Sequence, residues 1–269
     1  MRAWLKIRDL PAYRRDAFEA GLRASGWSVH ASRSQPFVPE SRDDLLVVWN
    51  RMKFFEPQCE KWEAEGGTVL VAENGYIQPE NLTDETRRYA LSVGDHNGAG
   101  WVPFLGSARA VGQGLWSVPR VLANIDKPNI LVLGQRGIGS TLMASPARWA
   151  EKTVREIKSG GGPTLAYSSV KIRQHPGLVD TCPTLREDLV GIDLVLTWAS
   201  GAAVQALAWG YPVLYYAPFW VAQAATGFYP EPDKIQAAMN NVANGQWSVA
   251  EIADGKPFRV MREMKWGRA

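Results

Sequence analysis

The sequence predicts an α/β protein with two Rossmann-like domains. Short apolar runs alternate with segments that have the length and stop signals of helices, which is the pattern of parallel sheets built from strand-helix-strand units. The clearest unit spans 194–216, where an apolar run ends at Ser200-Gly201, a small-residue helix runs to Gly210, and a second apolar run follows Pro212. With 269 residues, 46% of them apolar, the chain can build one large core or two small ones.

The first domain is expected to cover residues 1–115. Its elements follow from apolar runs that alternate with helical segments, and Gly66-Gly67 gives a helix stop. In chain order we expect a strand at 4–7, a helix at 12–25, a strand around 27–30, a strand at 45–49, a helix at 56–65 and a strand at 68–72.

A Gly-rich middle separates the two domains. Segments 95–100 and 106–114 are rich in Gly and short polar residues, so we expect loops there and place the interdomain crossover in this region. The second domain, 116–269, is expected to contain a strand at 129–133, a helix at about 145–158, a strand ending at 171–173 and a polar turn at 174–177. The sequence leaves open whether its last residues pack back on the first domain.

Charge and composition set limits on function. The net charge is +3, from 30 basic and 27 acidic residues, and a charge this small does not by itself indicate nucleic-acid binding. The basic pairs at 14–15 and 87–88 and the basic tail at 259–268 are typical both of polyanion grooves and of solvated helix faces. No run approaches the ~20 apolar residues of a membrane span, and a secretory signal is lacking at the N-terminus, so we expect a cytoplasmic protein.

The turn at Ser200-Gly201 is a candidate phosphate site. Ligands of parallel sheets bind beyond the carboxyl ends of the strands, and the unpaired N–H groups of a helix N-terminus favour an anion. The competing interpretation is that Ser200 is only a helix N-cap and Gly201 only a tight turn. A helix lined by Ala, Val and Leu must be buried, so either a bound group or a neighbouring loop has to satisfy its first donors.

Residues 129–220 resemble GT-B glycosyltransferases, above all capsule polysaccharide transferases and related phage-encoded sugar transferases. The matching motifs are a strand followed by Gln at 131–135, the Arg-x-His-Pro-Gly turn at 173–177 and the strand-Ser-helix-Gly-x-Pro-Val pattern at 194–213. The resemblance implies a compact pair of domains that face a cleft, with a nucleotide-sugar donor in the second. It assigns Ser200 and Gly201 to the diphosphate, His175 to the nucleotide or sugar, and Gln135 with Arg136 to the phosphates.

The remaining candidates for the donor site are a glutamine that would contact the ribose and two arginines that would contact the diphosphate. Many GT-B enzymes hold the ribose with a Glu on the helix, where this chain has Gln205, which can accept one hydrogen bond and donate another. The identity of the nucleotide is therefore left open, and a UDP-sugar is our first expectation. Arg136 and Arg173 are candidates for neutralising the departing diphosphate, or are structural ion-pair partners. No Asp-x-Asp motif is present, so we expect no metal and no cofactor besides the donor.

Asp95-His96 is the candidate for catalytic base. Glycosyl transfer requires the deprotonation of an acceptor hydroxyl, and this pair lies in a Gly-rich loop of the first domain. The chain has three histidines, His30, His96 and His175. The alternative is that Asp95 caps a turn, a common use of Asp. Which of the two residues acts as base is left open.

The functional hypotheses differ first in the acceptor that would receive the sugar. The first candidate is a hydroxymethylated pyrimidine in phage DNA, modified in the host cytoplasm, which would suit the basic tail and the twelve tryptophans. The alternatives are a polysaccharide or protein acceptor, then a sugar-nucleotide epimerase of the same fold, and then a non-catalytic module that binds carbohydrate or nucleic acid. The epimerase is disfavoured because few carboxylates lie between 163 and 220.

Overall fold

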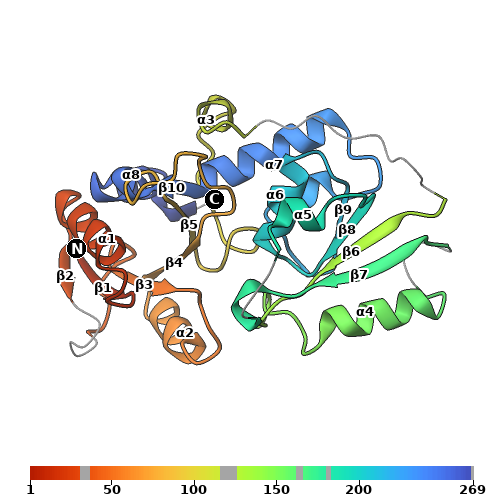
Figure 1. Cartoon of the computed structure of the whole chain (residues 1–269). Coiled ribbons are helices and arrows are strands. Elements are labelled where there is room, and N and C mark those ends of the chain that lie inside the picture. The colour runs from red at the N-terminus through yellow and green to blue at the C-terminus, as the bar shows by residue number, and fades with distance from the viewer. Residues whose placement is uncertain (31–36, 116–125, 162–165, 180–182, 268–269) are drawn as a thin grey trace. The chain divides into compact units, whose positions relative to one another are not determined.

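A computed structural model gives the fold, and it describes residues 1–30, 37–115, 126–161, 166–179 and 183–267 (Figure 1). The chain forms two compact units. Unit 1 comprises 1–109, 139–141 and 241–269, and unit 2 comprises 110–138 and 142–240. The expected domains, 1–115 and 116–269, therefore differ from the observed units in that the chain leaves unit 1 at Arg109 and its last 29 residues belong to unit 1.

Unit 1 is built on a six-stranded sheet in the order β10-β5-β4-β3-β1-β2. β1 pairs in parallel with β2 and β3, β3 pairs in parallel with β4, and β5 is antiparallel to both β4 and β10. The elements of this unit are β1 (Arg2–Lys6), α1 (Ala12–Ala24), β2 (Ser28–His30), β3 (Leu45–Trp49), α2 (Glu56–Ala64), β4 (Thr68–Asn74), β5 (Arg88–Val93), β10 (Gln246–Ser248), α8 (Val249–Ala253), α9 (Lys256–Glu263) and the 3-10 turn η3 (Lys265–Gly267).

Two apolar layers cover the sheet of unit 1. Alternate residues of a strand face opposite sides, so Leu45, Val47 and Trp49 of β3 pack with α1, α8 and α9, whereas Leu46 and Val48 pack with α2. The uninterrupted apolar run of β3 reflects this burial on both faces. The C-terminal segment contributes the fully buried side chains of Trp247, Phe258 and Met261, which explains why it belongs to this unit.

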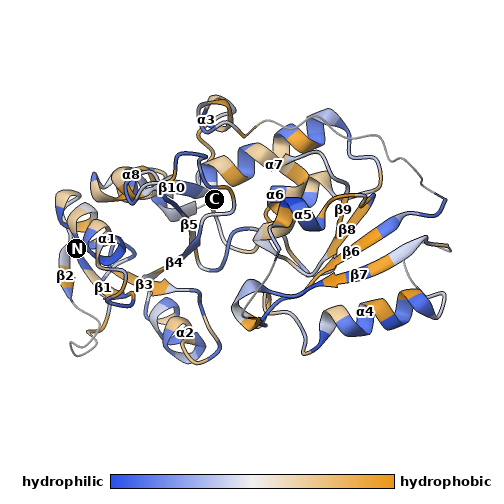
Figure 2. Ribbon diagram, viewed as in Figure 1, coloured by the Kyte–Doolittle hydropathy of each residue, from blue (hydrophilic) through white to orange (hydrophobic). Residues whose placement is uncertain are grey.

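Unit 2 has a four-stranded parallel sheet in the order β7-β6-β8-β9. α4 packs on one face through Trp149, Ala150 and Ile157, and α6 contacts β8 and β9. Figure 2 shows the apolar strands and the two-sided character of α4. The elements of this unit are β6 (Asn129–Leu133), α4 (Trp149–Lys158), β7 (Ser169–Arg173), η1 (Pro176–Leu178), α5 (Leu185–Asp188), β8 (Leu194–Thr197), α6 (Gly201–Ala208), β9 (Val213–Tyr215) and η2 (Gln223–Ala225). Two further helices, α3 (Ala108–Gly112) and α7 (Pro232–Gly245), cross the boundary between the units.

Two local expectations need correction. The segment 106–114, expected to be loop, contains α3, a single short turn of helix. The helix expected from about 145 starts only at Trp149, because Arg148 takes a left-handed conformation with φ 54°. No helix among the described residues is both long enough and apolar enough to span a membrane.

Candidate functional site

The carboxyl ends of three neighbouring parallel strands carry the expected donor-binding residues of unit 2. Gln135 and Arg136 follow β6, His175 follows β7, and Ser200 follows β8. Because β6 lies between β7 and β8, these loops share one edge of the sheet, where ligands of open α/β sheets bind. The side chain of Gln135 joins two of the loops, since its Oε1 accepts a hydrogen bond from the N–H of Ala199 at 2.9 Å.

The N-terminus of α6 is largely satisfied by the protein itself. Ser200 is its N-cap, and the Oγ accepts from the N–H of Ala202 at 3.2 Å. The Ser200 N–H donates to Oγ1 of Thr197 at 2.9 Å, and the Ala203 N–H donates to the Ser200 carbonyl at 3.1 Å. The N-cap interpretation of Ser200 therefore holds for the N–H groups of Ala202 and Ala203, and an anion at α6 has to rely on Gly201 and on charged side chains nearby.

Arg136 provides positive charge beside this edge, whereas His175 provides an imidazole whose charged form is disfavoured. Arg136 is exposed, and its guanidinium lies so close to Gly177 that a side chain at that position would contact it at 3.1 Å. The Nδ1 of His175 accepts from the Gly177 N–H at 2.9 Å, so a neutral His175 carries its proton on Nε2. Burial lowers the pKa of His175, and the charges of Arg136 and Arg173 lower it further.

Arg173 and Gln205 are less available to a ligand. The guanidinium of Arg173 forms an ion pair with Asp188 and donates to the carbonyl of Pro183 at 2.7 Å, so its charge is already compensated. This arrangement matches the structural alternative for Arg173. Gln205 lies one turn into α6 and is half-buried.

In unit 1, His96 is held by a carboxylate. Its Nδ1 lies 3.3 Å from Oε2 of Glu73, a residue of β4, and the other oxygen of Glu73 accepts from the hydroxyl of Tyr76 at 2.6 Å. His96 is 5% exposed, and among the described residues its Nε2 finds no hydrogen-bond partner. Burial alone would lower the pKa of His96, but the charges of Glu73 and Asp95 outweigh it and raise the pKa above its ordinary value.

Asp95 has a different environment. Its Oδ1 accepts from the N–H of His96 at 2.7 Å and from the hydroxyl of Ser140 at 2.9 Å, and its carbonyl accepts from the hydroxyl of Ser92. The buried guanidinium of Arg51 fixes the start of the same loop by donating to the carbonyl of Gly94 while it pairs with Glu63 at 2.9 Å. The carboxylate of Asp95 thus shapes the loop, as in the turn alternative, and His96 is left with the free basic nitrogen.

Glu73 and Tyr76 are the residues that sequence reasoning missed. The available signal was a carboxylate directly after the buried run 68–72, at the carboxyl end of a parallel strand. The contact between Ser140 and Asp95 carried no signal, because it joins positions 45 residues apart.

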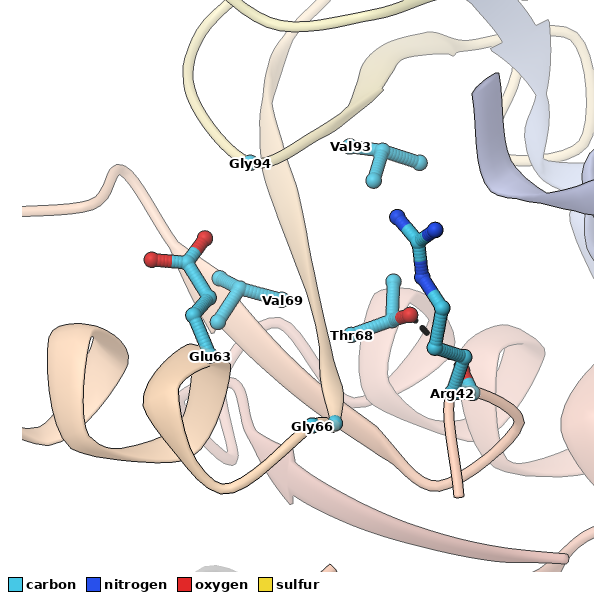
Figure 3. A pocket seen from close by; sticks show the side chains of 8 residues that line it. Arg42, Glu63, Gly66, Thr68, Val69, Val93 and Gly94 are labelled. Atoms are coloured by element: carbon cyan, nitrogen blue, oxygen red, sulfur yellow. Dashed lines mark hydrogen bonds between the residues drawn. The ribbon is translucent and has the colours of Figure 1, made fainter. Parts of the chain in front are cut away.

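A pocket of about 280 Å³ lies elsewhere in unit 1 (Figure 3). Arg42 and Glu63 stand on opposite sides of it, and Gly66, Thr68 and Gly94 line it between them. Thr68 opens β4, so this pocket lies at the amino end of the parallel strands, opposite to the edge that ligands of such sheets use. None of the expected site residues lines it.

Comparison with known proteins gives structural likeness only. No protein-family model and no curated protein sequence matches this chain. The KpsC beta Kdo 2,4 transferase of Thermosulfurimonas dismutans has a similar structure, with a TM-score of 0.52 and 15% sequence identity over 88% of this chain and 89% of that chain. The KpsC beta Kdo 2,7 transferase of the same organism gives a TM-score of 0.54 and 14% identity over 98% and 99%.

These similarities confirm the expected α/β fold class with Rossmann-like sheets and support its GT-B-like assignment. Both structures are named as sugar transferases, whereas neither name refers to DNA. At 14% and 15% identity the likeness concerns the fold, and the roles of individual residues must be argued from this chain.

Proposed function

We propose that this protein is a glycosyltransferase that moves a sugar from a nucleotide-sugar donor to a hydroxyl of a saccharide acceptor. The observation that carries the proposal is the buried pair of Glu73 and His96, in which one imidazole nitrogen faces a carboxylate and the other is free. A base oriented by a third group is the arrangement that activates a hydroxyl nucleophile. The similar folds of two sugar transferases support the reaction class.

In the proposed reaction, Nε2 of His96 accepts the proton of the acceptor hydroxyl while Glu73 holds the Nδ1–H. The hydroxyl oxygen forms the new bond to the anomeric carbon, and the bond from that carbon to the nucleotide phosphate breaks with its electron pair on the phosphate. Arg136, His175 and the start of α6 are proposed to stabilise this phosphate, and Gln205 to contact the ribose. Asp95 acts as a positioning residue through the backbone of His96.

A saccharide acceptor is favoured over DNA. The structurally similar proteins are named for Kdo transfer. The basic groups that suggested DNA are partly engaged within unit 1: Arg15 pairs with Glu19, and Arg259 pairs with Asp254. Arg268 of the basic tail lies outside the described residues. The polysaccharide alternative thus becomes our main proposal, and a DNA acceptor remains the one to compare with it.

The test is a transfer assay with uridine, guanosine, cytidine and thymidine sugars, nucleotide-linked Kdo included, against saccharide and hydroxymethylated DNA acceptors. His96→Gln should lower kcat by roughly 10²- to 10⁴-fold, because it removes the base, while the donor still raises Tm. His30→Gln is the matched control. We also expect turnover to persist in the presence of EDTA. Failure of every nucleotide sugar to bind, or full activity in His96→Gln, would overturn the proposal.

A further inference from the structure

Unit 1 presents an exposed aromatic ring on the turn that joins β3 to α2 (Figure 1). The side chain of Phe54 is 68% exposed, and the centre of its ring lies 4.2 Å from the ring centre of Phe55. Phe55 is the N-cap of α2 and packs against the apolar layer between that helix and the sheet. The outer ring of Phe54 thus rests on an inner ring that is anchored in the core.

The turn that carries Phe54 is held in one conformation by the protein itself. The N–H of Phe55 donates to the carbonyl of Met52 at 2.7 Å. The side chain of Arg51, which is 6% exposed, donates to Glu56 at 3.1 Å and ties the turn to the first residue of α2. A ring on such a support is already in place before a ligand arrives, so little conformational entropy is lost when a ligand covers it.

The same turn contacts the two segments that carry the proposed base and its carboxylate. The N–H of Asn50 donates at 2.8 Å to the carbonyl of Ala72, which directly precedes the carboxylate residue. The guanidinium of Arg51 donates to the carbonyl of Gly94, two residues before the base. Phe54 follows Arg51 by three residues, so their Cα atoms lie within about 11 Å of each other.

This position suits an extended acceptor. The turn follows β3 and the carboxylate residue Glu73 lies near the end of β4, so both lie toward the carboxyl ends of two neighbouring parallel strands, where ligands of such sheets bind. An oligosaccharide that offers a hydroxyl to His96 can therefore extend to the ring of Phe54. Isolated exposed apolar side chains are ordinary on protein surfaces. Phe54 is distinguished by its rigid support and by the contacts of its turn with the segments of the base.

We propose that Phe54 stacks on a pyranose ring of the saccharide acceptor and so contributes to the choice of acceptor. The inference rests on the proposed function and adds a specificity-determining residue to it. A pyranose carries C–H bonds on its faces and hydroxyl groups around its edge. Ligand sites cover such apolar surface with aromatic rings and leave a few polar groups to fix the orientation.

The first experiment detects contact at the ring itself and needs no turnover. The full chain, labelled with para-fluorophenylalanine, is titrated with the methyl glycosides of glucose, galactose, mannose and N-acetylglucosamine. Sorbitol is the matched control ligand, because it has hydroxyl groups but no ring face. Phe54→Leu and Phe37→Leu assign the fluorine NMR signals. The Phe54 signal should shift with at least one glycoside and not with sorbitol, whereas the signal of Phe37, which precedes β3 at the other end of the sheet, should stay fixed.

The second experiment separates stacking from catalysis in the transfer assay. Phe54→Ala should raise the KM for the acceptor roughly five- to tenfold, because the pyranose loses the apolar surface that covers it. The KM for the donor and the rate of donor hydrolysis should not change. Phe54→Trp should restore the KM for the acceptor, since it keeps an aromatic face. Val38→Ala is the control variant, because Val38 is 63% exposed and lies before β3, away from the base.

The outcomes separate this proposal from the proposed function. A Phe54 signal that no glycoside moves, or that sorbitol moves equally, overturns the stacking role even if transfer occurs, and so does an unchanged acceptor KM in Phe54→Ala. A signal that follows protein concentration and no sugar assigns the ring to a contact between copies of the chain and also overturns it. A shift with a glycoside, in a protein that binds no nucleotide sugar, preserves the sugar contact and overturns the proposed transferase.

Discussion

At the scale of single residues, the Glu73–His96 pair makes the protein sensitive to pH. The charge of Glu73 raises the pKa of His96, so Glu73→Gln should lower this pKa, measured by NMR titration of the imidazole protons. A base must be deprotonated, so the acid limb of kcat/KM should move to lower pH in the variant. Tyr76→Phe is the control, since it removes a hydrogen bond and keeps the charge of Glu73.

The same pair affects stability with a defined sign. A raised pKa in the folded state adds stability that is complete below about pH 6.5 and is lost as the pH rises through the folded pKa. The difference in Tm between wild type and Glu73→Gln should therefore be larger near pH 6 than near pH 9. A difference that grows with pH would contradict the assigned charge interaction.

The stability that Asp44 contributes depends on pH in the opposite direction. Burial would raise the pKa of Asp44, but the guanidinium of Arg2 and the N–H groups of Arg2 and Glu40, at 2.7 and 2.9 Å, hold it below its ordinary value. Asp44→Asn should cost about 1–3 kcal/mol at pH 7, measured by urea unfolding. The loss should shrink as the pH falls below about 4, where the carboxylate begins to protonate in the unfolded chain, and should disappear as the pH falls through the lower folded-state pKa. Glu40→Gln, at an exposed position, should change little.

At the scale of elements, two substitutions of Ser200 separate its role as the N-cap of α6 from its proposed role in donor binding. Ser200→Ala removes the cap and should lower the free energy of unfolding by about 1 kcal/mol. Ser200→Asp keeps a capping oxygen but adds a negative charge, so it should retain stability and lose the Tm increase produced by a nucleotide sugar. Donor binding that survives in Ser200→Asp would mean that Ser200 is only an N-cap.

The contact between α1 and α8 depends on the absence of a side chain at Gly21. A Cβ at this position would lie 1.8 Å from the carbonyl oxygen of Ile252. Gly21→Ala should therefore destabilise the protein by about 2 kcal/mol or more in chemical denaturation, although alanine favours a helix. Gly161→Ala is the control, because a Cβ there meets its nearest atom at 3.5 Å. A gain in stability for Gly21→Ala would show that the helices can separate at little cost.

The elements also show what the sequence could and could not predict. β3 and β6 match their predicted limits, 45–49 and 129–133, because strands buried on both faces read as uninterrupted apolar runs. β5 and β10 escaped prediction. Both contain polar residues, β10 has only three residues, and the two strands pair across more than 150 residues of chain, which no local pattern encodes. The same limit applies to the site: local chemistry predicted His96, while its partner Glu73 comes from another strand.

At the scale of the whole molecule, the chain returns to unit 1 after it has built unit 2, so unit 1 depends on its last residues. Trp247, Phe258 and Met261 are fully buried in the same core as Phe18 and Leu22 of α1. A chain that ends at Asn240 lacks β10, α8 and α9 and should lose the cooperative unfolding of unit 1. Amide hydrogen exchange provides the measurement.

In the shortened chain, the amides of β1 and β3 should lose their protection, whereas those of β6 and β8 should keep it, because the sheet of unit 2 is complete before residue 240. Removal of Gly267, Arg268 and Ala269 alone is the control, since the buried Trp266 is retained. Equal protection of β1 and β3 in the full and shortened chains would mean that α1 and the first strands suffice for a core. Retained protection in unit 2 would also permit donor binding to be measured there while His96, the proposed base, lies in an unfolded segment, which would separate donor recognition from catalysis.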